Sequence, residues 1–444
     1  MNKIIERDRA YTWHPYTQHG VEPDPIAIDR AKNASLFDVE GREILDLISS
    51  WWTCLHGHSH CELNEALAAQ AERLPHIMFA GFTHAPAVEL AEALVKAVPQ
   101  GQPNERLARV FYSDNGSTAV EVALKLAYQY WRNRGEEGRN IFVSFEGGYH
   151  GDTLGAMSVG TGSGFFNLFT DLMCAVKTVP FAETWDGDEE AERREDAALT
   201  ALKTVLQAER GRIAALIIEP MMQGAGGFRI CRPEFLRGVC DAARQEDILI
   251  IFDEVATGFG RTGPLFASEH AGVTPDLMCL SKGLTGGYLP LAATVASERI
   301  YSAFLDESFA KAFAHGHSFT ANPLASAVAV RSLALFEKEQ TFDRIKRIEQ
   351  QHRAILPELK KRREITRSRV LGTILACNLA DGEGGYKSEA SLFLKDWYLA
   401  HGLNIRPLGP VIYLMPPYCI TGQELRRAYE GLFAGLDALA SQGL

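Results

Sequence analysis

The sequence lacks any continuous run of 18 or more apolar residues, and its first residues carry charged side chains in place of an apolar core. We therefore expect neither a membrane span nor a signal peptide. Positive charge is also in deficit, because 45 lysines and arginines face 56 aspartates and glutamates, which gives a formal net charge of −11. Nucleic-acid binding needs a positive field, so the composition disfavours that class of protein.

Several sequence patterns that mark other protein classes are missing as well. The eight cysteines form no C-x-x-C pair and no regular framework, so we expect reduced, mostly buried thiols in a cytoplasmic protein. The chain has no G-x-S-x-G, no H-E-x-x-H and no Gly-Lys pair. These absences argue against the commonest kinds of hydrolase, metalloprotease and P-loop nucleotide-binding protein.

The fold class follows from short apolar runs in the middle of the chain. Their apolar residues are continuous and do not alternate with polar ones, which is typical of strands buried on both faces. The runs cover residues 109–113, 141–145, 214–220, 248–255, 276–282 and 291–297. Helical patterns at 117–134 and 233–247 lie between some of them. Strands that alternate with helices predict an α/β fold with a parallel or mostly parallel sheet flanked by helices.

The 444 residues are enough for two or three domains. We expect a large cofactor-binding domain at 61–335 and a smaller α+β domain at 336–444. The pattern over 335–364 predicts one long charged helix at the start of the smaller domain. The first 60 residues look irregular and aromatic, and we expect them to pack with the C-terminal part.

Polar residues stand where the buried runs end, and such strand ends collect functional groups in α/β sheets. They are Ser113, Glu219, Asp253 and Lys282. A buried acid and a buried lysine are costly without a purpose or a partner. A structural salt bridge between the two is the alternative explanation.

Residues 114–118 follow one strand and open a helix, so their backbone N–H groups and hydroxyls form an anion site. Taken alone, a Gly-Ser-Thr helix start is more often a plain helix cap. Together with the strand-end Asp and Lys, it supplies what pyridoxal 5′-phosphate needs. The phosphate goes to the helix start, the ring nitrogen to a carboxylate and the aldehyde to a lysine. The sequence therefore predicts pyridoxal 5′-phosphate as the cofactor.

Residues 253–263 (DEVATGFGRTG), 275–276 (PD) and 281–287 (SKGLTGG) resemble the signature of the class III, fold-type-I aminotransferases. The resemblance runs over nearly the whole chain. It implies that Lys282 forms the Schiff base and that Asp253 pairs with the ring nitrogen. Tyr149, the third residue implied to be catalytic, would stack on one face of the ring. The other implied cofactor-binding residues are Gly116, Ser117, Glu219, Val255, on the opposite ring face, and Ser318.

The ends of the chain resemble the branch of that family that acts in biotin synthesis. The resemblance rests on residues 13–18, 49–52, 406–409 and 412–418. It implies transfer of an amino group to 8-amino-7-oxononanoate, with S-adenosylmethionine as the expected donor. The implied substrate-binding residues are Tyr16, Trp51, Trp52, Tyr149, Lys282, Gly316 and Arg406. An aromatic slot suits a long methylene chain, and an arginine suits its far carboxylate.

The segment His315-Gly316-His317-Ser318-Phe319 departs from the family's common His-Gly-Pro-Thr-Phe. Ser318 keeps a hydroxyl for the phosphate, whereas His317 replaces a rigid proline. In the family this loop reaches the cofactor of the neighbouring subunit. The resemblance therefore implies a homodimer with active sites at the subunit interface.

Two other motifs in the sequence suggest different functions, but their own residues argue against them. Residues 258–263 match G-x-G-x-x-G, but Pro264 stands where the dinucleotide fingerprint needs a helix. The histidines in the segment 54–61 alternate and do not take the usual zinc spacings, so we expect a polar turn and no metal site. Two functional alternatives stay open. One is a class III enzyme for ω-amino acids or ornithine that uses pyruvate or 2-oxoglutarate, and the other is a catalytically silent protein that keeps the fold.

Overall fold

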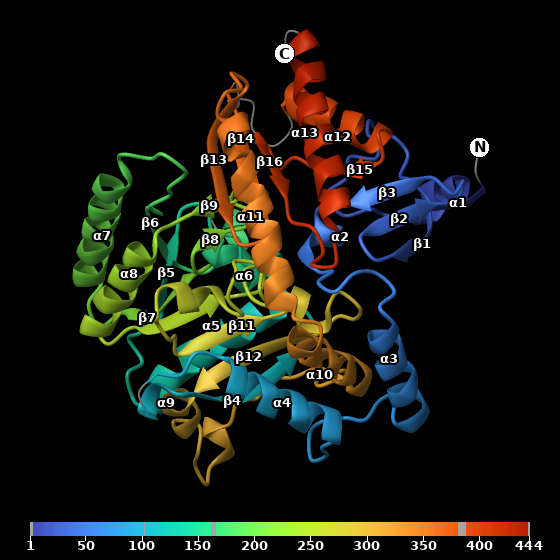
Figure 1. The fold of residues 1–444 in the computed structure, drawn as a ribbon. Helices are drawn as coiled ribbons and strands as arrows, with labels where there is room; N and C mark the ends of the chain where they lie inside the picture. The colour runs from blue at the N-terminus through green and yellow to red at the C-terminus, as the bar shows by residue number, and fades with distance from the viewer. Residues whose placement is uncertain (1–2, 102, 161–165, 381–387, 443–444) are drawn as a thin grey trace.

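A seven-stranded sheet forms the centre of the larger part of the molecule in the computed structural model, which describes residues 3–101, 103–160, 166–380 and 388–442 (Figure 1). The strand order is β4-β12-β11-β10-β7-β5-β6. Strand β12 is antiparallel to its two neighbours, and all other pairs are parallel. The mostly parallel α/β sheet is therefore confirmed. Its strands are β4 (Leu107–Ser113), β5 (Ile141–Phe145), β6 (Val176–Val179), β7 (Ile213–Ile218), β10 (Leu249–Asp253), β11 (Leu277–Leu280) and β12 (Ala292–Ser297).

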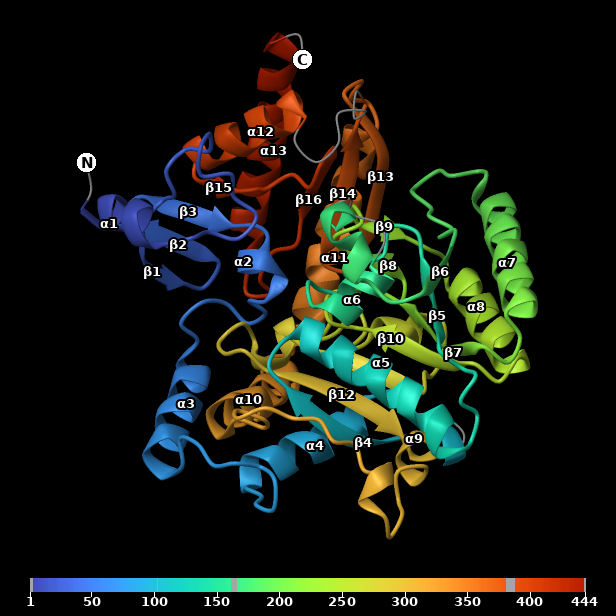
Figure 2. The same ribbon diagram turned by 180° about the vertical axis from the view of Figure 1, so that it is seen from behind.

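Helices cover both faces of this sheet (Figures 1 and 2). Helix α5 (Gly116–Asn133) packs with Ile217 and Ile251 on one face, whereas α8 (Pro233–Gln245) packs with Leu216 and Ile250 on the other. Neighbouring residues of one strand thus enter different cores, which explains why the strands are continuously apolar. The remaining helices of the larger part are α3 (Cys61–Arg73), α4 (Ala85–Ala97), α6 (Leu154–Val159), α7 (Ala191–Ala208) and α9 (Glu298–Ser302).

The prediction of a single long helix over 335–364 is wrong. Helix α10 (Pro323–Lys338) ends first, and α11 (Thr341–Leu359) begins after Gln340, which has a φ of +50°. This left-handed residue cannot continue a right-handed helix. The chain then forms a three-stranded antiparallel sheet and two further helices. They are β13 (Ile365–Leu371), β14 (Ile374–Leu379), β16 (Val411–Leu414), α12 (Glu389–Ala400) and α13 (Gly422–Gln442).

The N-terminal segment is also more regular than expected. It contains α1 (Lys3–Tyr11), β1 (Ile28–Lys32), β2 (Ser35–Asp38), β3 (Glu43–Asp46) and the short turn α2 (Ser49–Trp52). Strand β3 pairs in parallel with β15 (Leu403–Asn404), so the two ends of the chain share one sheet (Figure 2). The domain boundaries at 60 and 335 stay predictions. Strands β8 (Met222–Gln223) and β9 (Arg229–Ile230) pair with each other in a small antiparallel hairpin.

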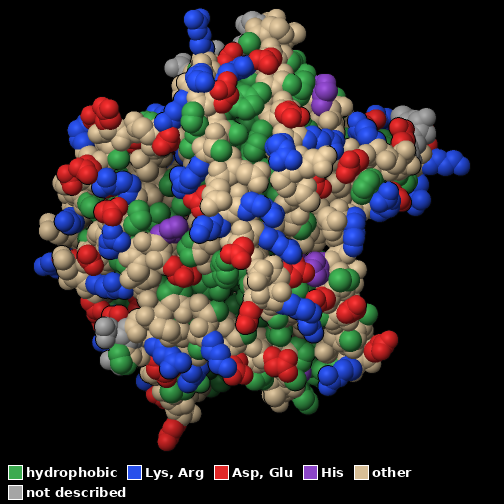
Figure 3. Space-filling model, in the orientation of Figure 1, with side chains coloured by type: hydrophobic (Ala, Val, Ile, Leu, Met, Phe, Trp, Pro, Cys, Tyr) green, Lys and Arg blue, Asp and Glu red, His purple; other side chains and the backbone are tan. Residues whose placement is uncertain are grey.

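The surface carries charges of both signs, and they are interspersed on the face shown in Figure 3. Within the described ranges, no helix has the length and apolar character that crossing a membrane requires. All eight cysteines are free, and five of them are buried. No disulfide therefore cross-links these cysteines, and the stability of the fold comes from the buried apolar clusters.

Candidate active site

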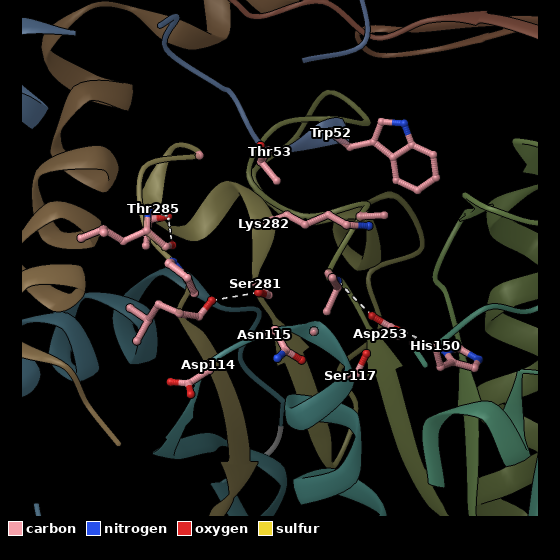
Figure 4. A pocket seen from close by; sticks show the side chains of 18 of the residues that line it. Trp52, Thr53, Asp114, Asn115, Ser117, His150, Asp253, Ser281, Lys282 and Thr285 are labelled. Carbon is pink, nitrogen blue, oxygen red and sulfur yellow. Dashed lines mark hydrogen bonds and ion pairs between the residues drawn. The ribbon is translucent and has the colours of Figure 1, made fainter. Parts of the chain in front are cut away.

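A cavity of about 470 Å³ lies at the carboxyl ends of β7, β10 and β11. In Figure 4 the side chain of Lys282 extends between Trp52 and Asp253. The cavity is lined by the following residues that the sequence singled out: Gly116, Ser117, Tyr149, Glu219, Asp253, Val255, Lys282 and Trp52. Strand ends and a helix start that are far apart in sequence thus meet in one place.

Lys282 opens a short 3₁₀ turn just after β11, with a φ of +44°. Its Nζ lies 4.4 Å from the ring centroid of Trp52. Burial lowers the pKa of Lys282 to about 8, although the negative charges of Asp253 and Glu219 act in the opposite direction. The lowered pKa makes the neutral amine, which a nucleophile or proton acceptor requires, more abundant near neutral pH than it is for an ordinary lysine.

Asp253 ends β10 and is 4% exposed, so its contacts decide its orientation. Its Oδ1 accepts a hydrogen bond from the N–H of Val255 at 3.0 Å. Its Oδ2 lies 2.7 Å from Nδ1 of His150, which is the donor because an ionised carboxylate only accepts. No sequence pattern marks His150 as a site residue, although it directly follows Tyr149.

The opposite wall of the cavity is the first turn of α5. The side chain of Asn115 accepts from the N–H of Thr118, and the Thr118 hydroxyl accepts from the N–H of Asn115. This reciprocal cap leaves the N–H groups of Gly116 and Ser117 at the helix start for an anion. A Cβ on Gly116 would lie 2.7 Å from Val255, so only glycine allows this close approach.

Gly151 supports the same wall, and replacing it with alanine should weaken binding of pyridoxal 5′-phosphate about tenfold or more. Its φ is +120°, and an added Cβ would lie 2.0 Å from the Ser117 hydroxyl oxygen. Overpacking of this kind costs about 1–3 kcal/mol. Gly263 is the matched control, because its φ is +117° and nothing lies within 4 Å of an added Cβ. Absorbance titration of both apo variants measures the affinity, and equal affinities would contradict the prediction.

Glu219 follows β7 and holds two backbone amides. Its carboxylate accepts from the N–H of Tyr149 at 3.1 Å and from the N–H of Gly224 at 2.8 Å. Burial, with the nearby charge of Asp253, raises the pKa of Glu219 to about 7. Glu219 therefore fixes the backbone that carries the Tyr149 ring at the cavity wall.

A second cavity, of about 550 Å³, adjoins the first and shares Lys282, Trp52, Thr53 and Tyr149 with it. It brings together the other expected substrate residues Tyr16, Trp51 and Arg406. The guanidinium of Arg406 lies 5.8 Å from the ring centroid of Trp51. Among the described residues, no carboxylate lies within 4.0 Å of that guanidinium.

Asp152 also lines the second cavity, although no sequence pattern marks it as a site residue. The hydroxyl of Tyr16 donates to Oδ2 at 2.6 Å, and the hydroxyl of Tyr149 donates to Oδ1 at 3.0 Å. The two tyrosines thus hold an exposed carboxylate at the cavity wall. Its negative charge favours a cationic group on a ligand.

The tryptophan pair sits on a left-handed turn. The four residues of α2 have φ values of 51°, 45°, 75° and 71°. Left-handed helical residues cost about 1–2 kcal/mol each, so strong local contacts must hold the turn. The indole N–H of Trp52 donates to the Tyr413 hydroxyl at 3.1 Å, and the ring packs edge-on against Phe228. Trp52 is therefore a fixed wall between the two cavities.

Gly316 and Ser318 do not line either cavity. Their loop lies beside α5, where His315 Nδ1 is 3.0 Å from the Lys125 amine and His317 Nδ1 is 3.4 Å from Asp114. A contact of this loop with the active site of a second copy stays a prediction.

The three histidines of the segment 56–60 each contact a different residue. His58 pairs with Asp46 at 2.9 Å, and His60 pairs with Glu339 at 2.9 Å. His56 lies 3.2 Å from the Ser332 hydroxyl. Within the part of the chain that the structure describes, no group of three or more His, Cys, Asp or Glu is placed to hold a metal ion.

The first cavity fits pyridoxal 5′-phosphate by the chemistry of its groups. Free N–H groups at the start of α5 suit the phosphate, and Asp253 suits a protonated ring nitrogen. The buried amine of Lys282 suits the aldehyde. Val255 and Tyr149 line the same space and offer a branched aliphatic and an aromatic contact.

Comparison with known proteins places this arrangement in a family. Residues 16–436 match the family model for class III aminotransferases. An adenosylmethionine-8-amino-7-oxononanoate aminotransferase from Synechococcus elongatus is 48% identical over 97% of this chain and 99% of its own. One of the same name from Geobacter sulfurreducens is 41% identical over 96% and 95%.

Solved structures agree with the sequence relatives. An adenosylmethionine-8-amino-7-oxononanoate aminotransferase from Methanocaldococcus jannaschii is 34% identical, with a TM-score of 0.90 over 98% of both chains. An omega transaminase from Pseudomonas jessenii in complex with PMP is 28% identical, with a TM-score of 0.92 over 99% of both chains. The chain therefore belongs to the class III aminotransferases, which are enzymes that depend on pyridoxal 5′-phosphate.

Proposed function

We propose that this enzyme transfers an amino group to 8-amino-7-oxononanoate in biotin biosynthesis, with S-adenosylmethionine as the donor. The observation that carries the proposal is the second cavity, where aromatic side chains lead from Lys282 to Arg406. A methylene chain fits the aromatic slot, and its far carboxylate fits a guanidinium that has no carboxylate partner among the described residues. The names of the two bacterial relatives support the same substrate.

The roles of the cofactor-binding residues are part of this proposal. The N–H groups of Gly116 and Ser117 bind the phosphate, and Asp253 holds a proton on the ring nitrogen. Tyr149 and Val255 pack on the ring. When bound, the cofactor withdraws electrons from the carbon that bears the amino group.

Lys282 moves the proton that the transfer requires. Its neutral Nζ takes a proton from the donor carbon and returns a proton to the carbon that receives the amino group. The pKa of about 8 suits both directions, because the amine is neither a strong base nor fully neutral near that pH. The Trp52 ring, 4.4 Å from Nζ, covers one side of the amine.

The substrate cavity offers one cationic and one anionic contact. Arg406 binds the carboxylate of the nine-carbon acceptor, whereas Asp152 faces the same cavity and attracts an ammonium or sulfonium group. Both proposed substrates carry a carboxylate and a positive charge. One cavity can therefore accept them in turn.

We also propose a cytoplasmic homodimer in which Gly316 and Ser318 complete the site of the second copy. The loop itself exposes an apolar side chain, because Phe319 is 56% exposed, and its ring lies 5.0 Å from that of His76. Met78 is 54% exposed on the same segment as His76. A second copy would cover this patch. Eight free thiols fit a reducing compartment.

The experiment that tests the function is an absorbance titration of the holoenzyme with S-adenosylmethionine, with lysine, alanine and an ω-amino acid in parallel. Loss of the long-wavelength cofactor band with S-adenosylmethionine, followed by recovery on addition of 8-amino-7-oxononanoate, is the expected result. If the band recovers with pyruvate or 2-oxoglutarate and not with the oxononanoate, the enzyme is instead an aminotransferase for ω-amino acids or ornithine.

Arg406→Ala should lower kcat/KM for 8-amino-7-oxononanoate about 10- to 150-fold. A hydrogen bond to a charged group contributes about 1.5–3 kcal/mol, and each 1.4 kcal/mol is a factor of ten. Steady-state kinetics with varied acceptor measure the effect. Arg210→Ala is the control, because Arg210 pairs with Glu246 on the surface away from both cavities. An unchanged kcat/KM in Arg406→Ala would remove Arg406 from the substrate site.

A further inference from the structure

Asp46, at the end of β3, has a side chain with no exposed surface, and it lines neither cavity. Asp46 nevertheless accepts hydrogen bonds from Ser50 and Asn404, which both line the substrate cavity. Its Oδ1 accepts from the N–H of Ser50 at 3.1 Å and from the side-chain amide of Asn404 at 3.1 Å. Its Oδ2 accepts from the Ser50 hydroxyl at 2.7 Å and from His58 Nε2 at 2.9 Å.

These contacts join two segments that are about 350 residues apart in sequence. Ser50 belongs to the left-handed turn that carries Trp51 and Trp52. Asn404 belongs to β15, two residues before Arg406, and β15 pairs with β3 directly at Asp46. A single buried carboxylate therefore links the aromatic wall to the segment that bears the guanidinium.

A buried cation holds the other end of the same turn. Arg261 is 1% exposed and donates to the carbonyls of Trp52 at 3.3 Å and Cys54 at 3.0 Å. Asp46 thus satisfies N–H groups where the turn begins, and Arg261 satisfies carbonyls where it ends. This is the charge pattern that stabilises a helical turn at its two termini. The unfavourable left-handed backbone is held from both sides.

We propose that Asp46 is a positioning residue that sets the spacing between the Trp51–Trp52 wall and Arg406, and so fits the cavity to the length of its carboxylate substrate. The inference rests on the proposed function for the identity of that substrate. Asp46 touches no substrate itself and acts through Ser50 and Asn404. His58 holds the second oxygen and so fixes the carboxylate plane.

The full set of contacts requires a carboxylate. Burial raises the pKa of Asp46, but hydrogen bonds from His58 and Ser50 outweigh burial and hold the pKa below its ordinary value. An amide of the same shape has one oxygen and one NH₂ group, and the NH₂ group only donates. In Asp46→Asn the NH₂ group faces one of two sets of partners. Facing the Ser50 N–H, it loses that hydrogen bond, and facing the Ser50 hydroxyl and His58, it obliges both of them to accept where they now donate.

The first test is amide hydrogen exchange of the holoenzyme without substrate. We expect faster exchange in Asp46→Asn both at residues 48–54 and at residues 403–406. Asp276→Asn is the matched control, because Asp276 is also a buried carboxylate that accepts from a backbone N–H, that of Ile250, and it lines neither cavity. Acceleration that is confined to one of the two segments, or that also appears in Asp276→Asn, would overturn the proposal.

The second test is a double-mutant cycle on kcat/KM for 8-amino-7-oxononanoate. Asp46→Asn should lower it tenfold or more in the wild-type background and less than threefold in the Arg406→Ala background, because the carboxylate contact is already gone there. A merely structural role predicts the same fold-change in both backgrounds. If the wild type does not use this substrate, the proposed function fails, and the exchange experiment still decides the role of Asp46.

Asn404→Ala provides a second route if Asp46→Asn does not fold. It removes the side-chain link to Asp46 and leaves the backbone pairing of β3 with β15. Exchange should then accelerate at residues 403–406 and stay unchanged at residues 48–54. Unchanged exchange at residues 403–406 would show that the side-chain link does not hold the Arg406 segment, and it would overturn the proposal.

Discussion

Lys282→Ala is expected to lower the rate of amino transfer by about 10²- to 10⁴-fold, the usual contribution of a positioned proton-transfer group. Lys282 is the buried amine at the junction of the two cavities, and the proposed mechanism assigns it both proton transfers. Alanine leaves no group there that can carry a proton. Single-turnover measurement of the aminated product by mass spectrometry gives the rate directly.

The control is Lys203→Ala, an exposed lysine on α7. Both variants should keep the wild-type unfolding temperature within a few degrees, because burying a charged or polar amine does not stabilise a fold by itself. The phosphate and ring contacts do not involve Lys282, so its variant should still bind the cofactor reversibly. Turnover of Lys282→Ala at the wild-type rate would refute the mechanism.

The central sheet could be predicted from the sequence because five of its strands, β5, β7, β10, β11 and β12, are buried throughout and therefore carry largely apolar runs. The edge strand β4 is only partly buried, but its own apolar residues still mark it. Strand β6 was missed, since it has four residues and only Val179 is fully buried. The break between α10 and α11 was missed for a different reason. It depends on the backbone conformation of Gln340, which has no glycine or proline to signal it.

The candidate site was predictable where function and local pattern coincide. Asp253, Glu219 and Lys282 end apolar runs, and Gly116 opens a helix, so a linear scan finds them. His150 and Asp46 gave no such signal. Their partners lie 103 and 358 residues away, at Asp253 and Asn404, and only the folded chain brings these pairs together.

The substrate residues needed a resemblance to known proteins. Tyr16, Trp51 and Arg406 come from three separate segments and share no periodicity or spacing that physical rules can interpret. Taken alone, each is most simply a core or surface residue. The structure brings them to one cavity, while their roles in binding stay a proposal.

Asp253→Asn should reduce the rate of amino transfer by about 10- to 10³-fold. An opposite charge at close range shifts a pKa by about 1–3 units, and the amide removes the charge that keeps the ring nitrogen of the cofactor protonated. The variant keeps the side-chain shape, so the cavity itself should persist. Steady-state kinetics and the absorbance spectrum of the bound cofactor measure the two consequences together.

His150→Gln separates the charge of Asp253 from its orientation. It removes the imidazole 2.7 Å from Oδ2, while the carboxylate charge and the hydrogen bond from Val255 remain. We therefore expect His150→Gln to slow transfer clearly less than Asp253→Asn and to leave the spectrum near that of the wild type. Equal losses in the two variants would mean that the exact angle of the carboxylate, and not its charge, limits the reaction. Comparing the rate losses of Asp253→Asn and His150→Gln therefore shows whether the charge or the orientation of Asp253 matters more for the reaction.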